Sequence, residues 1–196
     1  MTARIKKTKI GDVLECKLNN DLKCYIQYVA SDISQLNCDV IRVFKKVYNV
    51  SDPPSLTSIL KDEVLFYSHC DTIAGIREGI WSLFGNSSDV GDISTVSFRT
   101  PLNPKDMDDP SSCGWVVWNV NENRVIIDNL TREQESYSLG YVFPVKIVFQ
   151  KIRDEIMCKW SHVRPWRMEG WLQKLIKYWN PSINLKLKVV EEIMDF

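Results

Sequence analysis

The residues with the clearest chemical potential are a cysteine and a histidine near the C-terminal end of the sequence. Cys158 and His162 are four positions apart in a helical stretch, so their side chains fall on one face. Such a pair can form a reactive thiolate or supply two ligands to a metal ion. No third ligand follows at a recognisable spacing, so an enzyme built on this pair is an alternative and not the expectation.

Three further reactive residues are consecutive: His69, Cys70 and Asp71. They end a strand-like segment, and neighbouring side chains of a strand point to opposite faces. The three therefore do not converge on one site. The sequence also contains no phosphate-binding, dinucleotide-binding, zinc-protease or serine-hydrolase motif. We expect a protein that is not an enzyme and that has no cofactor and no metal site.

Charge is balanced overall but unevenly distributed along the chain. The 25 basic residues equal the 25 acidic ones, yet the segment 145–190 holds ten basic residues against three acidic ones. The remainder is correspondingly acidic, most densely at Asp106, Asp108 and Asp109. These aspartates resemble half of a calcium-binding loop but lack its glycine and its final glutamate. We interpret them as a solvated acidic loop within a chain whose two ends differ in charge.

Composition is that of a globular protein in a reducing compartment. The chain is 44% hydrophobic and 26% charged, and its 196 residues suit a single domain. Its six cysteines include no C-x-x-C pair, and the first residues lack the apolar run of a signal peptide. No run approaches the ~18 apolar residues of a membrane helix. We expect free thiols, no disulfides, no membrane contact and a cytoplasmic location.

The first two thirds of the chain has the patterns of short strands. A hairpin is predicted where the segments 9–18 and 22–29 flank turn formers at 19–21, and a second where 115–120 and 124–127 flank 121–123. Other strands are expected at 38–48, at 64–70, around Trp81 and at 94–98, with a short helix near 56–60. The glycines at 75, 79 and 85 argue against a helix from 76 to 84.

The last third changes to helical periodicity. Thr131 and Gln134 have capping-box spacing and predict a short helix over 131–139. A long helix is expected after Pro144, and its apolar face is Val145, Val148, Phe149, Ile152, Ile156 and Trp160. A third helix is expected over 169–179, and an edge strand or docked tail over 185–190.

These elements predict an α+β fold. We expect a small curved antiparallel sheet or an SH3-like barrel, with the C-terminal helices packed on it. Residues 1–196 would form one domain, with a mainly β module at 1–130 and a helical extension at 131–196.

The basic C-terminal part offers an alternative function. Lysines and arginines alternate there with aromatic residues, as in grooves that bind single-stranded nucleic acid by base stacking and phosphate pairing. Two of the tryptophans, Trp160 and Trp179, fall on apolar helix faces and are expected in the core. Trp166 and Trp171 stay free to stack on bases, so a nucleic-acid-binding adaptor is the alternative.

Several short motifs resemble the immunity protein 26 family of bacterial polymorphic-toxin systems. They are Lys9-x-Gly11-Asp12-Val13, Tyr25-x-Gln27-Tyr28-Val29, Gly79-Ile80-Trp81-Ser82-Leu83-Phe84-Gly85, Phe98-Arg99, and the Trp-bearing hairpin at 115–127. The helix after Pro144 also has the expected position, so the resemblance covers roughly residues 5–155. It implies a bacterial immunity protein that binds and neutralises a cognate toxin in the cytoplasm without catalysis.

A partner surface can be predicted from charge and loop length. Toxins that attack nucleic acids have basic clefts, and carboxylates on an inhibitor accelerate its association with them. The long segment around Asp106, Asp108 and Asp109 has little apparent structure, and the hairpin beginning at Trp115 follows it. We therefore predict that Asp106, Asp108, Asp109 and Trp115 contact the toxin. The sequence leaves the oligomeric state open.

Overall fold

The computed structural model describes residues 7–102 and 114–161, with side chains as far as residue 156, and it is an α+β protein, as predicted. The larger sheet has the strand order β5-β3-β2-β1-β6, and β4 pairs with β2. Its strands are β1 (Asp12–Lys17), β2 (Leu22–Asp32), β3 (Cys38–Phe44), β4 (Tyr48–Asn49), β5 (Val64–His69) and β6 (Trp81–Asn86).

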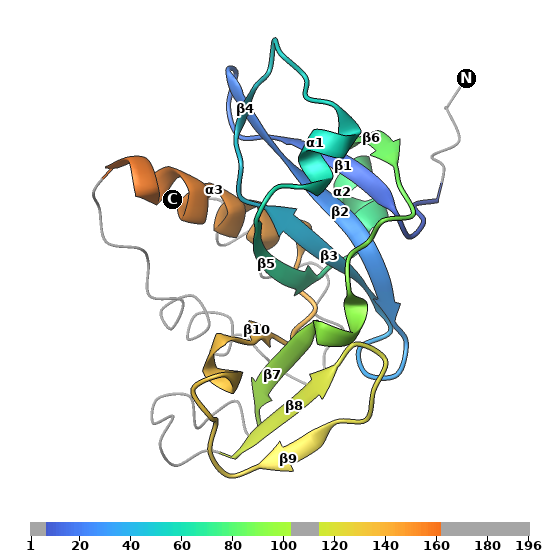
Figure 1. The fold of residues 1–196 in the computed structure, drawn as a ribbon, viewed down its shortest axis with the longest axis vertical. Helices are drawn as coiled ribbons and strands as arrows, with labels where there is room; N and C mark the ends of the chain where they lie inside the picture. Colours follow the sequence, from blue (N-terminus) through green and yellow to red (C-terminus); the bar gives the residue numbers. More distant parts are fainter. Residues whose placement is uncertain (1–6, 103–113, 162–196) are drawn as a thin grey trace.

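The smaller sheet has the order β10-β7-β8-β9 and lies at one end of the larger one (Figure 1). Its strands are β7 (Ser97–Pro101), β8 (Trp115–Asn119), β9 (Val125–Ile127) and β10 (Ser138–Leu139). The α-helices are α1 (Leu56–Leu60), α2 (Thr72–Arg77) and α3 (Val145–Ser161), with short 3-10 turns at Ile93–Thr95 and Gln134–Ser136. Neither sheet closes, so the open-sheet alternative describes the fold and the barrel does not.

Both predicted hairpins are present. In the first, β1 and β2 pair antiparallel from Val13 opposite Gln27 to Lys17 opposite Lys23. The side chain of Asn19 accepts hydrogen bonds from the backbone N–H groups of Asp21 and Leu22, both at 2.8 Å, and so closes the turn. The second hairpin joins β8 to β9, and its turn contains a residue with positive φ, Asn121. Asparagine tolerates this conformation better than most residues.

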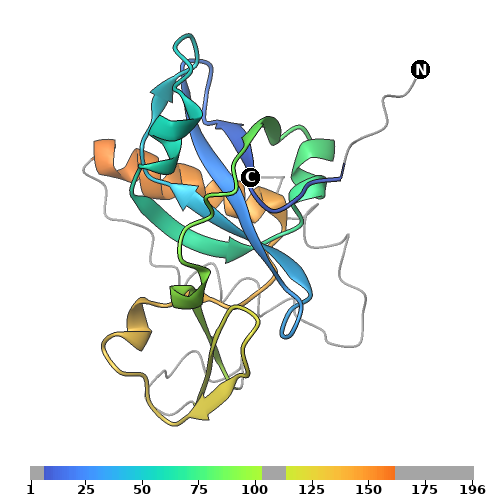
Figure 2. The ribbon, with the colours of Figure 1, turned by 45° about the vertical axis from the view of Figure 1, so that its right-hand side comes forward.

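The helix predicted after Pro144 packs against the larger sheet. Its residues Val145, Val148, Ile152 and Ile156 are buried together with residues of β1, β2 and β3, which confirms the predicted apolar face. Figure 2 shows α3 behind these strands. The side chain of Trp160 lies outside the described part of the chain. The helix predicted at 169–179 and the strand at 185–190 also lie outside it.

One helix was not expected. Gly75 argued against helix, yet α2 forms around it because Asp71 caps its first turn, accepting a hydrogen bond from Ala74 N at 2.9 Å. Gly75 serves close packing: a Cβ built at this position would lie 1.9 Å from Trp81 Cε2. The indole of Trp81 also donates from Nε1 to the carbonyl of Thr72 at 2.9 Å. The glycine is therefore needed for the contact between α2 and β6.

Replacing Gly75 by alanine is expected to lower the free energy of unfolding by about 1–3 kcal/mol, because Trp81 must move to admit the methyl group. Gly85→Ala is the matched control. A Cβ there would meet only Leu56 at an ordinary 3.6 Å, so its effect should stay within about 0.5 kcal/mol. Urea denaturation of both variants measures the difference. Equal stability of the two variants would show that Trp81 has room to adjust.

The prediction of a helix over 131–139 is wrong, although the predicted capping box is present. Thr131 N donates to Gln134 Oε1 at 2.8 Å, and Gln134 N donates to Thr131 Oγ1 at 3.3 Å, as in a capping box. Only a 3-10 turn follows, and Ser138–Leu139 then pairs in parallel with β7. Pairing with the smaller sheet replaces the helix.

None of the helices in the described residues has the length and apolar character needed to span a membrane.

Candidate interaction surface at the junction of the two sheets

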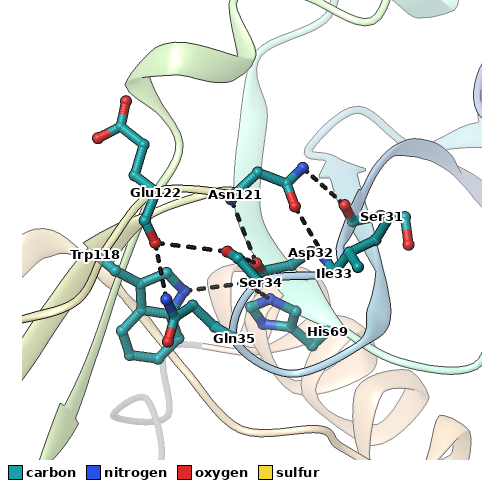
Figure 3. Close-up of polar contacts among 9 residues, drawn as sticks. All are labelled: Ser31, Asp32, Ile33, Ser34, Gln35, His69, Trp118, Asn121 and Glu122. Carbon is teal, nitrogen blue, oxygen red and sulfur yellow. Dashed lines mark hydrogen bonds and ion pairs between the residues drawn. The ribbon is translucent and has the colours of Figure 1, made fainter.

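A buried carboxylate joins the two sheets. Asp32 Oδ2 lies 3.0 Å from both His69 Nε2 and Trp118 Nε1. Asp32 Oδ1 accepts from the backbone N–H of Asn121 at 3.3 Å and from Ser34 Oγ at 3.4 Å. Asp32 and His69 are fully buried. Figure 3 shows how these five residues, which we call the Asp32 cluster, converge.

Each member of the Asp32 cluster is positioned by a strand end or a turn. Asp32 is the last residue of β2, and His69 is the last residue of β5. Trp118 lies in β8 of the smaller sheet, and Phe98 of β7 packs its ring 4.1 Å from the imidazole of His69. Gly140 makes room for Trp118, because a Cβ there would lie 1.9 Å from the indole. The cluster therefore depends on both sheets being in place.

A second set of hydrogen bonds joins the exposed loops above this cluster. Asn121 Oδ1 accepts from Ile33 N at 2.9 Å, and Asn121 Nδ2 donates to the carbonyl of Ser31 at 2.8 Å. Gln35 Nε2 donates to the carbonyl of Glu122 at 2.8 Å. These contacts fix the β2–β3 turn against the β8–β9 hairpin, as Figure 3 shows. We call residues 33–35 and 121–126 the two-loop surface.

The two-loop surface exposes large apolar side chains. Ile33 is 69% exposed, Val125 54% and Ile126 62%. Seven large hydrophobic residues of the described chain are at least half exposed; one of them, Ile33, lies in the β2–β3 turn, and two lie in β9. Because Val125 and Ile126 are neighbours in a strand, their side chains point to opposite faces of it. β9 is also the last strand of its sheet, so no described strand pairs with its outer edge. Apolar side chains on such an edge are typical of contact surfaces.

His69 is held in its neutral form. Burial lowers the pKa of His69 below its ordinary value of 6.5, and the hydrogen bond to Asp32 only partly offsets this effect. The other ring nitrogen, Nδ1, is buried and has no hydrogen-bond partner among the described residues. An Asp–His pair can act as a base in catalysis, but here both side chains are fully buried. We assign the pair a role in positioning the loops.

The structure separates the consecutive residues His69, Cys70 and Asp71, as the sequence predicted. His69 contacts Asp32, Cys70 lies in the core of the larger sheet, and Asp71 caps α2. The alternative pair at positions 158 and 162 lies outside the described side chains. Cys16, Cys24, Cys38 and Cys70 are free thiols.

Of the predicted partner-binding residues, only Trp115 falls within the described part of the chain. It is 8% exposed, pairs with Ile127 across β8 and β9, and has the guanidinium of Arg99 5.1 Å above its ring. The side chain is thus buried, although the predicted contact with a toxin would need it to be accessible. Asp106, Asp108 and Asp109 lie outside the described residues. The exposed apolar residues of the same hairpin are Val125 and Ile126 in β9.

Comparison with protein-family models gives no match for this chain, and comparisons with curated proteins and with solved structures give none either. The resemblance to the immunity protein 26 family therefore stays a hypothesis, resting on the motifs described above.

Proposed function

We propose that this protein binds a partner protein through the two-loop surface and that, as its resemblance implies, the partner is a toxin neutralised without catalysis. One observation carries the proposal. Ile33 in the β2–β3 turn and Ile126 in β9 are exposed on segments that hydrogen bonds hold in one arrangement. A surface ordered before binding loses less conformational entropy in the complex, which favours tight association.

Charge around the smaller sheet indicates the kind of partner. In the described residues from 92 to 136, there are five carboxylates and three arginines. All five acidic residues are exposed: Asp92, Glu122, Asp128, Glu133 and Glu135. Arg99 is partly buried and lies against Trp115. A basic partner would be attracted to this end of the molecule, and toxins that act on nucleic acids are basic at their clefts.

The nucleic-acid alternative rests mainly on residues beyond 161. Within α3, Lys151 places its ammonium 3.9 Å from the ring centre of Phe66, and burial lowers its pKa. Gln150 and Asp154 are hydrogen-bonded to each other at 2.8 Å. Lys151 thus packs within the protein and is not available to a phosphate, whereas Lys146 and Arg153 of the same helix are exposed.

The double variant Ile33→Ser with Ile126→Ser should weaken binding to the toxin encoded beside this gene by about tenfold or more, equivalent to ~1.4 kcal/mol. Both side chains are exposed, so folding should be unaffected. Leu83→Ser is the matched control, because Leu83 is 53% exposed on β6 of the other sheet. Surface plasmon resonance measures the affinities.

Two results would contradict different parts of the proposal. Failure of the parent protein to bind or neutralise the toxin would reject the immunity function. Full binding by the double variant would keep that function and move the contact elsewhere, in which case the joint replacement of Asp106, Asp108 and Asp109 by asparagine tests the acidic segment. A reduced association rate at low salt would then identify that segment.

A further inference from the structure

We propose that His69 makes the junction of the two sheets sensitive to pH: protonation of its imidazole weakens the Asp32 cluster and loosens the two-loop surface. This inference adds regulation to the proposed binding surface. The predicted effect of His69 protonation on the two loops, however, concerns this protein alone and does not depend on whether the partner is a toxin.

The geometry favours neutral His69. The Nε2 atom is 3.0 Å from a carboxylate oxygen, so Nε2 bears the hydrogen and donates it to Asp32. Nδ1 then has only a lone pair. A buried acceptor without a partner costs less free energy than a buried N–H donor without one. Protonation would place an N–H group at Nδ1, where no described atom accepts a hydrogen bond. A buried donor without an acceptor destabilises the state that contains it.

Among the described residues, one charged group acts on His69. Asp32 on β2 is the titratable side chain whose charge acts on the imidazole. The other elements packed around it contribute Val40 on β3, Phe98 on β7, Trp118 on β8 and the backbone N–H of Phe143, which donates to the carbonyl of His69 at 3.0 Å. None of these groups titrates or can stabilise an imidazolium cation by accepting from Nδ1.

An ion pair with Asp32 would favour protonation, so the two effects oppose each other. The Asp32 carboxylate already accepts from Trp118 Nε1, from Asn121 N and from Ser34 Oγ. These neutral donors stabilise its negative charge without help from His69. The desolvation of a fully buried imidazolium therefore outweighs the attraction, and the pKa of His69 is lowered.

The direction of the pH effect follows from this lowered pKa. The unfolded chain, with an ordinary histidine pKa of 6.5, binds the proton at a higher pH than the folded protein does. The stability contributed by neutral His69 is thus complete above pH 6.5 and is lost as the pH falls towards the folded pKa. Because the Asp32 cluster fixes the two loops, we expect local opening there to become more frequent over the same range.

The test uses the fact that the chain has only two histidines, so His162→Gln leaves His69 as the single imidazole. Its pKa is read from NMR titration, and backbone protection factors, corrected for intrinsic exchange rates, are measured for residues 31–35 and 119–122 at pH 7.5 and pH 5.0. Each unit by which the His69 pKa lies below 6.5 allows a tenfold change in the opening equilibrium. We expect protection in these two segments to fall, with β1 and residues 22–30 of β2 unchanged.

The comparison variant adds His69→Gln, whose side-chain amide still donates to Asp32 but does not titrate. In it, the protection of residues 31–35 and 119–122 should be the same at both pH values. A pKa of His69 at or above 6.5 would overturn the proposal, and so would unchanged protection in the protein that keeps His69. Neither result involves the toxin, so failure here is distinct from failure of the binding function.

Discussion

Replacing Asp32 by alanine is expected to lower the free energy of unfolding by roughly 2–5 kcal/mol, among the largest effects of any single substitution in this protein. The carboxylate is fully buried and is the common acceptor of the Asp32 cluster. Its removal leaves the indole N–H of Trp118 and the Nε2 donor of His69 buried without an acceptor. It also frees the backbone N–H of Asn121.

Ser34→Ala is the matched control for this prediction. Ser34 belongs to the same cluster, but it is exposed and its hydroxyl is 3.4 Å from Asp32 Oδ1. Its removal should change stability by no more than about 0.5 kcal/mol. Chemical denaturation gives the two free energies, and near-UV circular dichroism reports whether the packing of the aromatic side chains, Trp118 among them, is retained. A small loss of stability in Asp32→Ala would mean that water replaces the carboxylate and that the junction is not dry.

Local elements of the fold were predictable because their signals are local. The turn at 19–21 closes through the side chain of Asn19 itself. The apolar face of α3 repeats at helical spacing and is buried as that spacing predicts. Errors arose where tertiary contacts prevailed: α2 tolerates Gly75 because Trp81 fills the space above it, and 138–139 joins β7 despite the cap at Thr131.

The candidate site was not predictable in the same way. Asp32 and Trp118 are 86 positions apart in the sequence and meet only when both sheets have formed. The length of β2, which continues beyond its pairing with β1 towards the smaller sheet, was the available clue. Asn121 gave a turn signal, but its hydrogen bonds to Ser31 and Ile33 depend on tertiary structure. Sequence patterns therefore identify the two turns but do not show that they contact each other.

The junction also explains why binding and stability should be separable in this protein. The residues that fix the two loops, Asp32, His69 and Trp118, are buried, whereas Ile33 in the β2–β3 turn and Ile126 in β9 are exposed. Substitutions in the first set alter folding and, through it, the surface. Substitutions in the second set alter only the surface. Both sets of variants can be measured in one denaturation assay and one binding assay. If the surface is ordered before binding, variants of the buried set should lose both stability and affinity, whereas variants of the exposed set should lose only affinity.

Ile152→Ala is expected to lower the free energy of unfolding by about 2–5 kcal/mol, because it opens a cavity between α3 and the larger sheet. Ile152 is fully buried, with 0% of its surface accessible to solvent. It lies in the hydrophobic cluster that includes Leu14, Ile26 and Ile41. The adjacent residue Arg153 is exposed, so Arg153→Ala is the control and should shift stability by less than about 0.5 kcal/mol.

Thermal and urea denaturation of both α3 variants decide whether the helix is part of one cooperative unit with the sheet. A single transition, shifted to lower temperature in Ile152→Ala and unshifted in Arg153→Ala, is the expected result. Two transitions would mean that α3 separates before the sheet unfolds. Parental stability in Ile152→Ala would contradict the packing itself, because truncating a side chain this deeply buried removes contacts that no rotamer change of Val148 or Ile156 can fully replace.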